Sequence, residues 1–242
     1  MGAGAALLHI SAFFLYLYVI YFLHVQNAKK ALISEDKTIK TIAIFSRRFL
    51  TNWTFAIQEI YFFICILQHL LSLLSANKIK DKLTKYSDYL FTSIATPMAL
   101  MVSIVFWAIF VFDRELIFPK VLDQVIPVWI NHCIHTFNSV IPVVDMFLIN
   151  HKFPTWSKAL QGTLTYLLIY SICIFGTYFQ TGIWLYPLFA VLNWPQRILL
   201  CVGVFVVAAA MYGLTKVIHH IIWGSVTVAP EKSKKGSKHK RK

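Results

Sequence analysis

Six long apolar stretches, separated by short polar and basic segments, make up most of the sequence. A bilayer core takes about 20 mostly apolar residues per helix, and each stretch is long enough to cross it. The pattern therefore predicts an all-α, polytopic membrane protein with six transmembrane helices. The expected spans cover, to within a few residues, positions 3–25, 49–74, 89–112, 125–149, 160–179 and 198–223. Because the loops are short, residues 1–230 are expected to form one membrane domain, followed at 231–242 by a disordered basic tail on the cytosolic side.

Composition supports this prediction and excludes two other classes of protein. Hydrophobic residues make up 58% of the chain, charged residues 14%, and the mean hydropathy is +0.64. In a soluble domain about a quarter of all residues are usually charged, and a disordered chain has low hydrophobicity. The four cysteines, Cys65, Cys133, Cys173 and Cys201, all lie inside apolar stretches. They are expected to be small buried hydrophobic residues and not a disulfide framework.

The positive charge indicates contact with membrane lipids and not with nucleic acid. The chain has 23 Lys and Arg against 10 Asp and Glu, and these cations lie between and after the apolar runs. Six spans place both termini on one side, and the excess of Lys and Arg in that side's segments favours the cytosol. Lys238 and Lys240 have the spacing of a retrieval signal for the endoplasmic reticulum, and the plasma membrane remains an alternative location.

Polar residues concentrate in the fourth apolar stretch, which contains Asn131, His132, His135, Asn138 and Asp145. At 100° per residue, Asn131, His135 and Asn138 fall on one face of a continuous helix. Such a face is either a polar seam that joins two helices or a functional site inside the membrane. Spacing alone favours the seam.

The second apolar stretch offers a matching polar face with Thr51, Thr54 and Gln58. Threonines in membrane helices usually bond their own backbone. In the six-span topology, however, Thr51 and His135 lie toward the same side of the membrane, and histidine is a natural base for a hydroxyl nucleophile. The histidines form too few clusters for a di-iron centre, so no metal or cofactor is expected.

Three segments resemble a known family. They read FLTNWTFAIQ at 49–58, FDRELIFPKVLDQVIPVWINHCIHTF at 112–137 and TGIWLYPLF at 181–189. They are similar to the androgen-induced membrane proteins, in particular to the branch of regulators of tissue factor pathway inhibitor. The resemblance implies a multi-pass threonine hydrolase that cleaves fatty-acid esters of hydroxy fatty acids through an acyl-threonine intermediate.

The resemblance also implies the catalytic residues, Thr51 as the nucleophile and His135 as its partner. Asn131, His132 and Gln58 are candidates for stabilising the oxyanion, because they lie on the same polar faces. The expected partners are a lipid ester substrate and the surrounding lipids, and the sequence specifies no protein partner. The alternative hypothesis is a non-enzymatic regulator or scaffold that affects tissue factor pathway inhibitor. A transporter is a weaker third hypothesis, because no internal repeat is visible.

Overall fold

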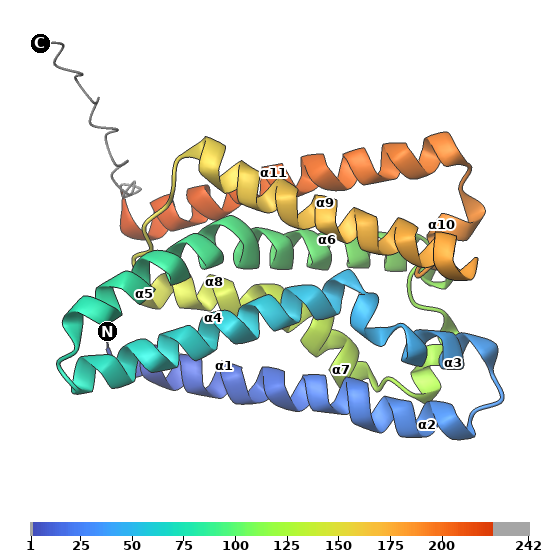
Figure 1. Ribbon diagram of the computed structural model, residues 1–242, viewed down its shortest axis with the longest axis horizontal. Coiled ribbons are helices and arrows are strands. Elements are labelled where there is room, and N and C mark those ends of the chain that lie inside the picture. The colour runs from blue at the N-terminus through green and yellow to red at the C-terminus, as the bar shows by residue number, and fades with distance from the viewer. Residues whose placement is uncertain (1, 225–242) are drawn as a thin grey trace, which may run out of the picture.

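In the computed structural model, which describes residues 2–224, the chain forms an all-α bundle whose long helices run alongside one another (Figure 1). The helices are α1 (Ala3–Tyr21), α2 (Asn27–Ile33), α3 (Lys37–Ile44), α4 (Leu50–Leu73), α5 (Asn77–Leu90), α6 (Thr96–Asp113), α7 (Val128–His132), α8 (Asn138–Leu148), α9 (Trp156–Thr181), α10 (Pro187–Val191) and α11 (Trp194–Trp223). Three π-helical turns join consecutive helices, at Phe22–Gln26, Phe91–Ala95 and Cys133–Phe137. Short 3-10 turns lie at Ser46–Arg48, Arg114–Leu116 and Lys120–Gln124. The expected tail at 231–242 lies outside the described residues.

Five helical segments within residues 2–224 are long and apolar enough to cross a membrane, so the predicted count of six is close but not exact. They are Ala3–Ile33, Leu50–Leu73, Asn77–Leu116, Trp156–Thr181 and Trp194–Trp223. The expected span at 125–149 instead forms α7, a π-helical turn and α8, an interrupted and more polar segment. Its 21 residues from Val128 to Leu148 still extend about 30 Å at 1.5 Å per residue. They run through the bundle close to α1 and α6 (Figure 1).

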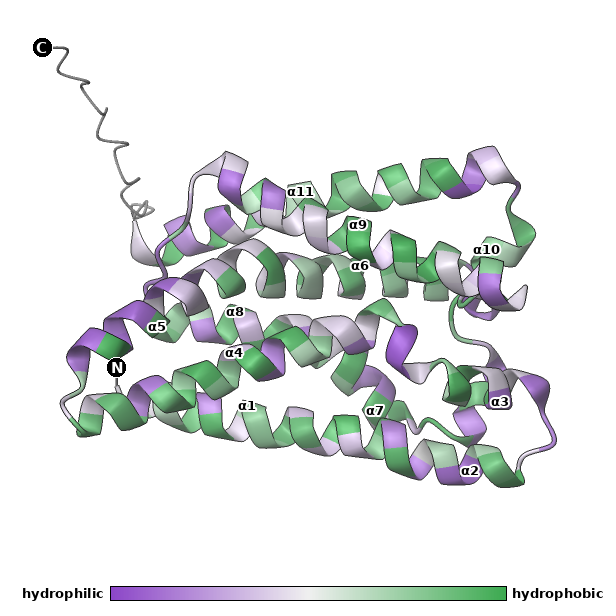
Figure 2. Ribbon diagram, viewed as in Figure 1, coloured by the Kyte–Doolittle hydropathy of each residue, from purple (hydrophilic) through white to green (hydrophobic). Residues whose placement is uncertain are grey.

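The surface of the bundle matches a lipid environment. Apolar residues cover the long helices, and hydrophilic residues gather toward their ends (Figure 2). Large aliphatic and aromatic side chains such as Ile172, Phe179 and Val206 are more than half exposed. A protein in water would bury such side chains, because exposed apolar area costs roughly 25 cal/mol per Å². The chain is therefore an integral, multi-pass membrane protein.

Local sequence signals fix both ends of the connection between α9 and α11. This connection forms one side of the candidate site described below. Gly182 ends α9 in the left-handed conformation, with φ +72°, which glycine adopts without strain. Asn193 and Gln196 begin α11 with a reciprocal capping box, and Pro195 occupies the first turn, where its missing N–H is not needed. These signals fix where the α9–α11 connection leaves and re-enters the bundle.

Packing between α1 and α4 holds the helix that carries Thr51. The ring of Tyr16 stacks on Phe55 with 4.2 Å between centroids, and its edge meets Phe62. All three side chains are almost fully buried. Aromatic pairs of this kind contribute about 0.5–1.5 kcal/mol beyond the area they bury.

Candidate active site

Thr51 lies in the first turn of α4, and its position is set by two tyrosines. The helix begins at Leu50, after Phe49 in extended conformation. The backbone N–H of Leu50 is free of the helical hydrogen-bond ladder. It lies 3.0 Å from the hydroxyl oxygen of Tyr170 and 3.1 Å from that of Tyr186, and it donates to both. The start of α4 is thereby tied to α9 and to the segment before α10.

His135 lies in the π-helical turn Cys133–Phe137, and two contacts determine how its ring is held. Its Nδ1 is 2.7 Å from Oδ1 of Asn131, one turn earlier. Its ring stacks on Phe106 of α6 with 3.4 Å between centroids and 3° between planes. Because an amide oxygen only accepts hydrogen bonds, Nδ1 carries the proton and Nε2 is left with a free lone pair.

The free Nε2 of His135 faces the hydroxyl of Thr51 at 3.4 Å. This is a long hydrogen bond, and contacts between catalytic groups commonly shorten when substrate binds. His135 is buried, with 5% of its surface exposed, while Thr51 is half-buried. The pair therefore has the orientation of a nucleophile and its base, supported by Asn131 as a third group.

Both side chains line an apolar cavity of about 200 Å³ between α4, α6, α9 and α11. Most of its wall is aliphatic or aromatic, including Met101 and Val105 of α6 and Phe205 of α11. Tyr170 and Tyr186 also line it. An apolar wall with a few convergent polar groups is the usual form of a small-molecule site, and here it suits a hydrocarbon chain.

The other residues expected at the site lie elsewhere. Gln58 is buried and bonds the hydroxyl of Tyr16 through its oxygen and Asn138 through its nitrogen, away from the cavity. His132 is exposed, bonds Thr136 at 3.1 Å and faces a separate pocket. The structure thus brings together Thr51, His135 and Asn131, and does not place Gln58 or His132 beside them.

Two features of the site were not found from the sequence. The tyrosines come from segments remote from the two stretches that carry Thr51 and His135, although Tyr186 lies in the segment TGIWLYPLF that carries the family resemblance. Asn131 was identified by its place on the polar face, but its role as the partner of His135 Nδ1 follows only from the geometry.

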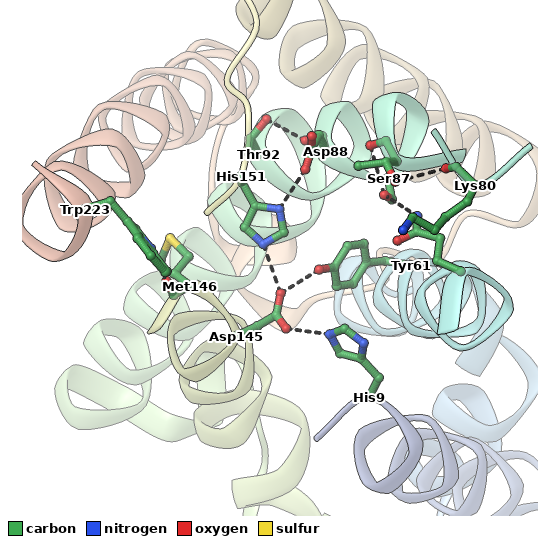
Figure 3. Close-up of polar contacts among 12 residues, drawn as sticks. His9, Tyr61, Lys80, Ser87, Asp88, Thr92, Asp145, Met146, His151 and Trp223 are labelled. Atoms are coloured by element: carbon green, nitrogen blue, oxygen red, sulfur yellow. Dashed lines mark hydrogen bonds and ion pairs between the residues drawn. The ribbon is translucent and has the colours of Figure 1, made fainter. Parts of the chain in front are cut away.

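A second buried polar cluster, separate from the candidate site, links α1, α4, α5 and α8 (Figure 3). Asp145 accepts hydrogen bonds from His9 at 2.7 Å, Tyr61 at 2.5 Å and His151 at 3.1 Å. His151 also bonds Asp88 at 2.9 Å. Asp145 therefore does not touch His135, as its spacing along the helix predicts.

His151, in the connection between α8 and α9, is held as an imidazolium. Both of its nitrogens face carboxylates, and only the charged ring has a proton on each nitrogen. Burial disfavours this charge, but the hydrogen bonds and negative charges of Asp145 and Asp88 outweigh it and raise the pKa of His151 to about 9. The cluster is a structural connection between helices, and it accounts for Asp145, the charged residue of the fourth stretch.

Comparison with known proteins gives a consistent family assignment. The chain is 34% identical to the human androgen-dependent TFPI-regulating protein over 78% of its own length and 81% of the relative's. It is 33% identical to the rat protein of that name over 77% of this chain and 81% of the relative. It is 32% identical to the human androgen-induced gene 1 protein over 78% of this chain and 83% of the relative. No solved structure matches the chain. The model of the FAR-17a/AIG1-like protein family matches residues 4–220, and with these relatives it shows that the chain belongs to this family.

Proposed function

We propose that this protein is an intramembrane threonine hydrolase that cleaves fatty-acid esters of hydroxy fatty acids. One observation carries the proposal: the hydroxyl of Thr51 faces the free Nε2 of His135 at 3.4 Å on the wall of an apolar cavity. The substrate class comes from the family resemblance. It agrees with the cavity, because acyl chains gain about 0.8 kcal/mol for each methylene taken out of water.

The first half of the reaction forms an acyl-threonine. Nε2 of His135 takes the proton of Thr51 as the hydroxyl oxygen attacks the ester carbonyl, which gives a tetrahedral oxyanion. The oxyanion collapses, the bond to the alkoxide oxygen breaks, and His135 returns the proton to that oxygen. The hydroxy fatty acid leaves, and the acyl group remains on Thr51 Oγ1.

The second half releases the fatty acid. His135 now takes a proton from water, which attacks the acyl-threonine carbonyl, and the protonated histidine returns it to Thr51 Oγ1. Throughout both halves, Asn131 keeps the proton of the His135 ring on Nδ1, so the unprotonated Nε2 faces Thr51 and the substrate. An imidazolium formed during each step is stabilised by this hydrogen bond.

The oxyanion needs a hydrogen-bond donor, and the tyrosine pair supplies one. The hydroxyls of Tyr170 and Tyr186 lie 2.9 Å apart and share one hydrogen bond, which uses one of their two protons. The second proton has no acceptor among the described residues. Both tyrosines line the cavity, and both hydroxyls lie beside Leu50, the residue that precedes Thr51. This role replaces the one expected of Asn131, His132 or Gln58.

The test uses the purified full-length protein in detergent or lipid nanodiscs, with a palmitic ester of hydroxystearic acid as substrate. Thr51→Ala and His135→Ala should each abolish turnover and labelling by a hydroxyl-directed fluorophosphonate, while the fold remains intact by thermal unfolding. Thr54→Ala is the matched control for Thr51, because Thr54 bonds the carbonyl of Leu50 at 3.0 Å. His132→Ala is the matched control for His135. Turnover by Thr51→Ala at the wild-type rate would disprove the proposal.

A non-enzymatic regulator is the second candidate, because a human relative at 34% identity is named as a TFPI-regulating protein. In this case Thr51→Ala and His135→Ala would leave any effect on tissue factor pathway inhibitor unchanged, and the wild type would show no ester hydrolysis. The same panel of variants therefore separates the two functions.

The proposed setting is the endoplasmic reticulum or the plasma membrane, with both termini in the cytosol. The start of α1 and the end of α11 lie at the same end of the bundle (Figure 1). The excess of basic residues on that side supports its placement in the cytosol. Tags read by protease protection at either terminus test this orientation.

A further inference from the structure

Arg197, in the first turns of α11, is a buried cation without an acidic partner. Only 9% of its surface is exposed. Its guanidinium packs against two indole rings that are inclined to each other at 68°, and lies 4.6 Å from the centroid of Trp184 and 4.9 Å from that of Trp194. The ion pairs found among residues 2–224 do not include Arg197. A buried charge of this kind is costly unless an anion pairs with it.

The hydrogen-bonding capacity of this guanidinium is mostly unused. Its Nε donates to the carbonyl oxygen of Phe189 at 2.8 Å. An arginine has five N–H donors, and the four on Nη1 and Nη2 have no partner in the part of the chain that the structure describes. Nη1 and Nη2 are not completely enclosed by other atoms, so this edge of the planar guanidinium is accessible. Two parallel N–H pairs match the two oxygens of a carboxylate.

The position of Arg197 connects it to the cavity of the candidate active site. The face of α11 that lines the cavity carries Leu200, Cys201, Val204 and Phe205. Residues three and four apart share a helix face, so Arg197 occupies the next place on this face, toward the start of the helix. Arg197 is not itself among the residues that line the cavity, but Phe189, whose carbonyl accepts its hydrogen bond, does line it. Arg197 therefore lies just beyond one end of the cavity wall.

We infer that Arg197 binds the free carboxylate of the substrate, a long-chain acid that is esterified within its chain. The inference rests on the proposed hydrolase function, and it assigns the residue that recognises the acid end. The indole rings of Trp184 and Trp194 pack against the guanidinium, and the carbonyl of Phe189 accepts the hydrogen bond of its Nε. The carboxylate then binds at one end of the cavity while the ester reaches Thr51.

This arrangement predicts selectivity for the position of the ester. Arg197 and Thr51 are both fixed, Arg197 by the indoles and Thr51 through the bonds of Leu50 to Tyr170 and Tyr186. The number of methylenes between carboxylate and ester must therefore match a fixed span. Esters that are branched too close to the carboxylate cannot occupy both places at once.

An arginine at a membrane interface commonly extends its side chain toward lipid headgroups. Arg197 does not have this form, because its side chain is buried, packs against two indole rings and donates a hydrogen bond to a backbone carbonyl. A lipid phosphate nevertheless presents similar oxygens, so the experiment must separate a headgroup from a fatty-acid carboxylate.

The experiment compares two substrates and three variants of the full-length protein in nanodiscs of neutral lipid. The substrates are a palmitic ester of hydroxystearic acid and the same ester with a methyl group in place of the free carboxyl group. The variants are Arg197→Gln, Arg197→Lys and Arg114→Gln. Arg114 is the matched control, since it also stacks on aromatic rings but is paired with Asp123 at 2.7 Å.

The wild type should have a higher kcat/KM for the acid than for the methyl ester. Arg197→Gln should lower kcat/KM for the acid by about 10- to 100-fold through a rise in KM, which is the range expected for loss of a charged hydrogen bond. The neutral ester should be unaffected. Arg197→Lys should recover part of the preference for the acid, because lysine keeps the positive charge but lacks the planar guanidinium. Arg114→Gln should leave both substrates unchanged.

Three outcomes would overturn the inference. An equal loss for both substrates in Arg197→Gln would indicate a structural role, and an unchanged preference would indicate that the acid binds elsewhere. Phosphatidic acid added to the nanodiscs should not compete with the acid substrate, and competition that Arg197→Gln removes would assign the site to a headgroup. Failure of the hydrolase proposal is recognised separately, because the wild type would then hydrolyse neither ester, or Thr51→Ala would hydrolyse both at the wild-type rate.

Discussion

Asn131 offers the sharpest test of how the site works, because it touches His135 and not the reacting atoms. Asn131→Leu keeps the volume of the side chain and removes the acceptor that lies 2.7 Å from Nδ1 of His135. The imidazole can then move its proton to Nε2, the nitrogen that faces Thr51 at 3.4 Å. A protonated Nε2 cannot accept the proton of the threonine. Asn131 is therefore a positioning residue.

The expected magnitudes follow from these contacts. Loss of the correct tautomer in a hydroxyl–histidine enzyme lowers kcat by up to about 10⁴, so a fall of about 10²–10⁴ is expected here. An unsatisfied buried N–H also costs about 1–3 kcal/mol of stability. KM should change little, since Asn131 is not among the residues that line the cavity.

The assay measures kcat and KM for the ester, with thermal unfolding as the control for folding. Asn131→Asp should recover much of kcat, because a carboxylate also accepts from Nδ1–H. Asn138→Leu is the matched control: Asn138 is equally buried in the same segment but bonds Gln58 and not His135. A wild-type kcat in Asn131→Leu, or an equal fall in Asn138→Leu, would refute the positioning role.

Three further predictions test other parts of the structure. In the double variant Tyr170→Phe, Tyr186→Phe, kcat should fall by about 10²–10³ with little change in KM, as for a lost oxyanion donor. Each single variant keeps one free hydroxyl proton, so its kcat should fall less. Equal losses of kcat in the single and double variants would contradict this role. His151 has a pKa of about 9 in the folded protein, above its ordinary value near 6.5. Its ion pairs should therefore add about 3 kcal/mol to the free energy of unfolding below pH 6.5, and this contribution should disappear as pH rises through 9. Unfolding free energies from pH 6 to 10 should show this slope in the wild type and a flatter one in His151→Gln, and identical slopes would exclude the role. Cys201→Trp places a large ring in the cavity wall, so turnover of long-chain esters should fall at least about tenfold while folding is retained, and wild-type turnover would show that the acyl chain binds elsewhere.

The fold class could be predicted from the sequence because the constraint behind it is strong. A helix in a bilayer must satisfy its own backbone hydrogen bonds, so a long apolar stretch has few other structures available. The interrupted helix at 125–149 could not be predicted in this way. Its polar residues, among them Asn131 and Asp145, lower its hydropathy, and its π-helical turn is not visible in residue spacing.

The candidate site was predictable only in part. The residues Thr51 and His135 stood out through a family resemblance, and the structure places their side chains face to face. The supporting groups were not predictable, since Tyr170, Tyr186 and Arg197 come from segments that meet only in the folded bundle. Spacing along one helix says nothing about the side chains that a neighbouring helix contributes.

The π-helical turn at Cys133–Phe137 has a consequence for how such a segment can evolve. A π-helical turn is an α-helical turn widened by one added residue. Within this turn His135 faces Thr51 and is held by Asn131, whereas Asp145, beyond the turn, bonds His9 in the buried polar cluster. His135 and Asp145 are ten positions apart, and deletion of a single residue within the turn would leave nine, about two and a half turns of a continuous helix at 100° per residue. The two groups would still lie on roughly opposite faces, so the turn accommodates a one-residue insertion without bringing the structural anchor onto the face of the candidate reaction centre.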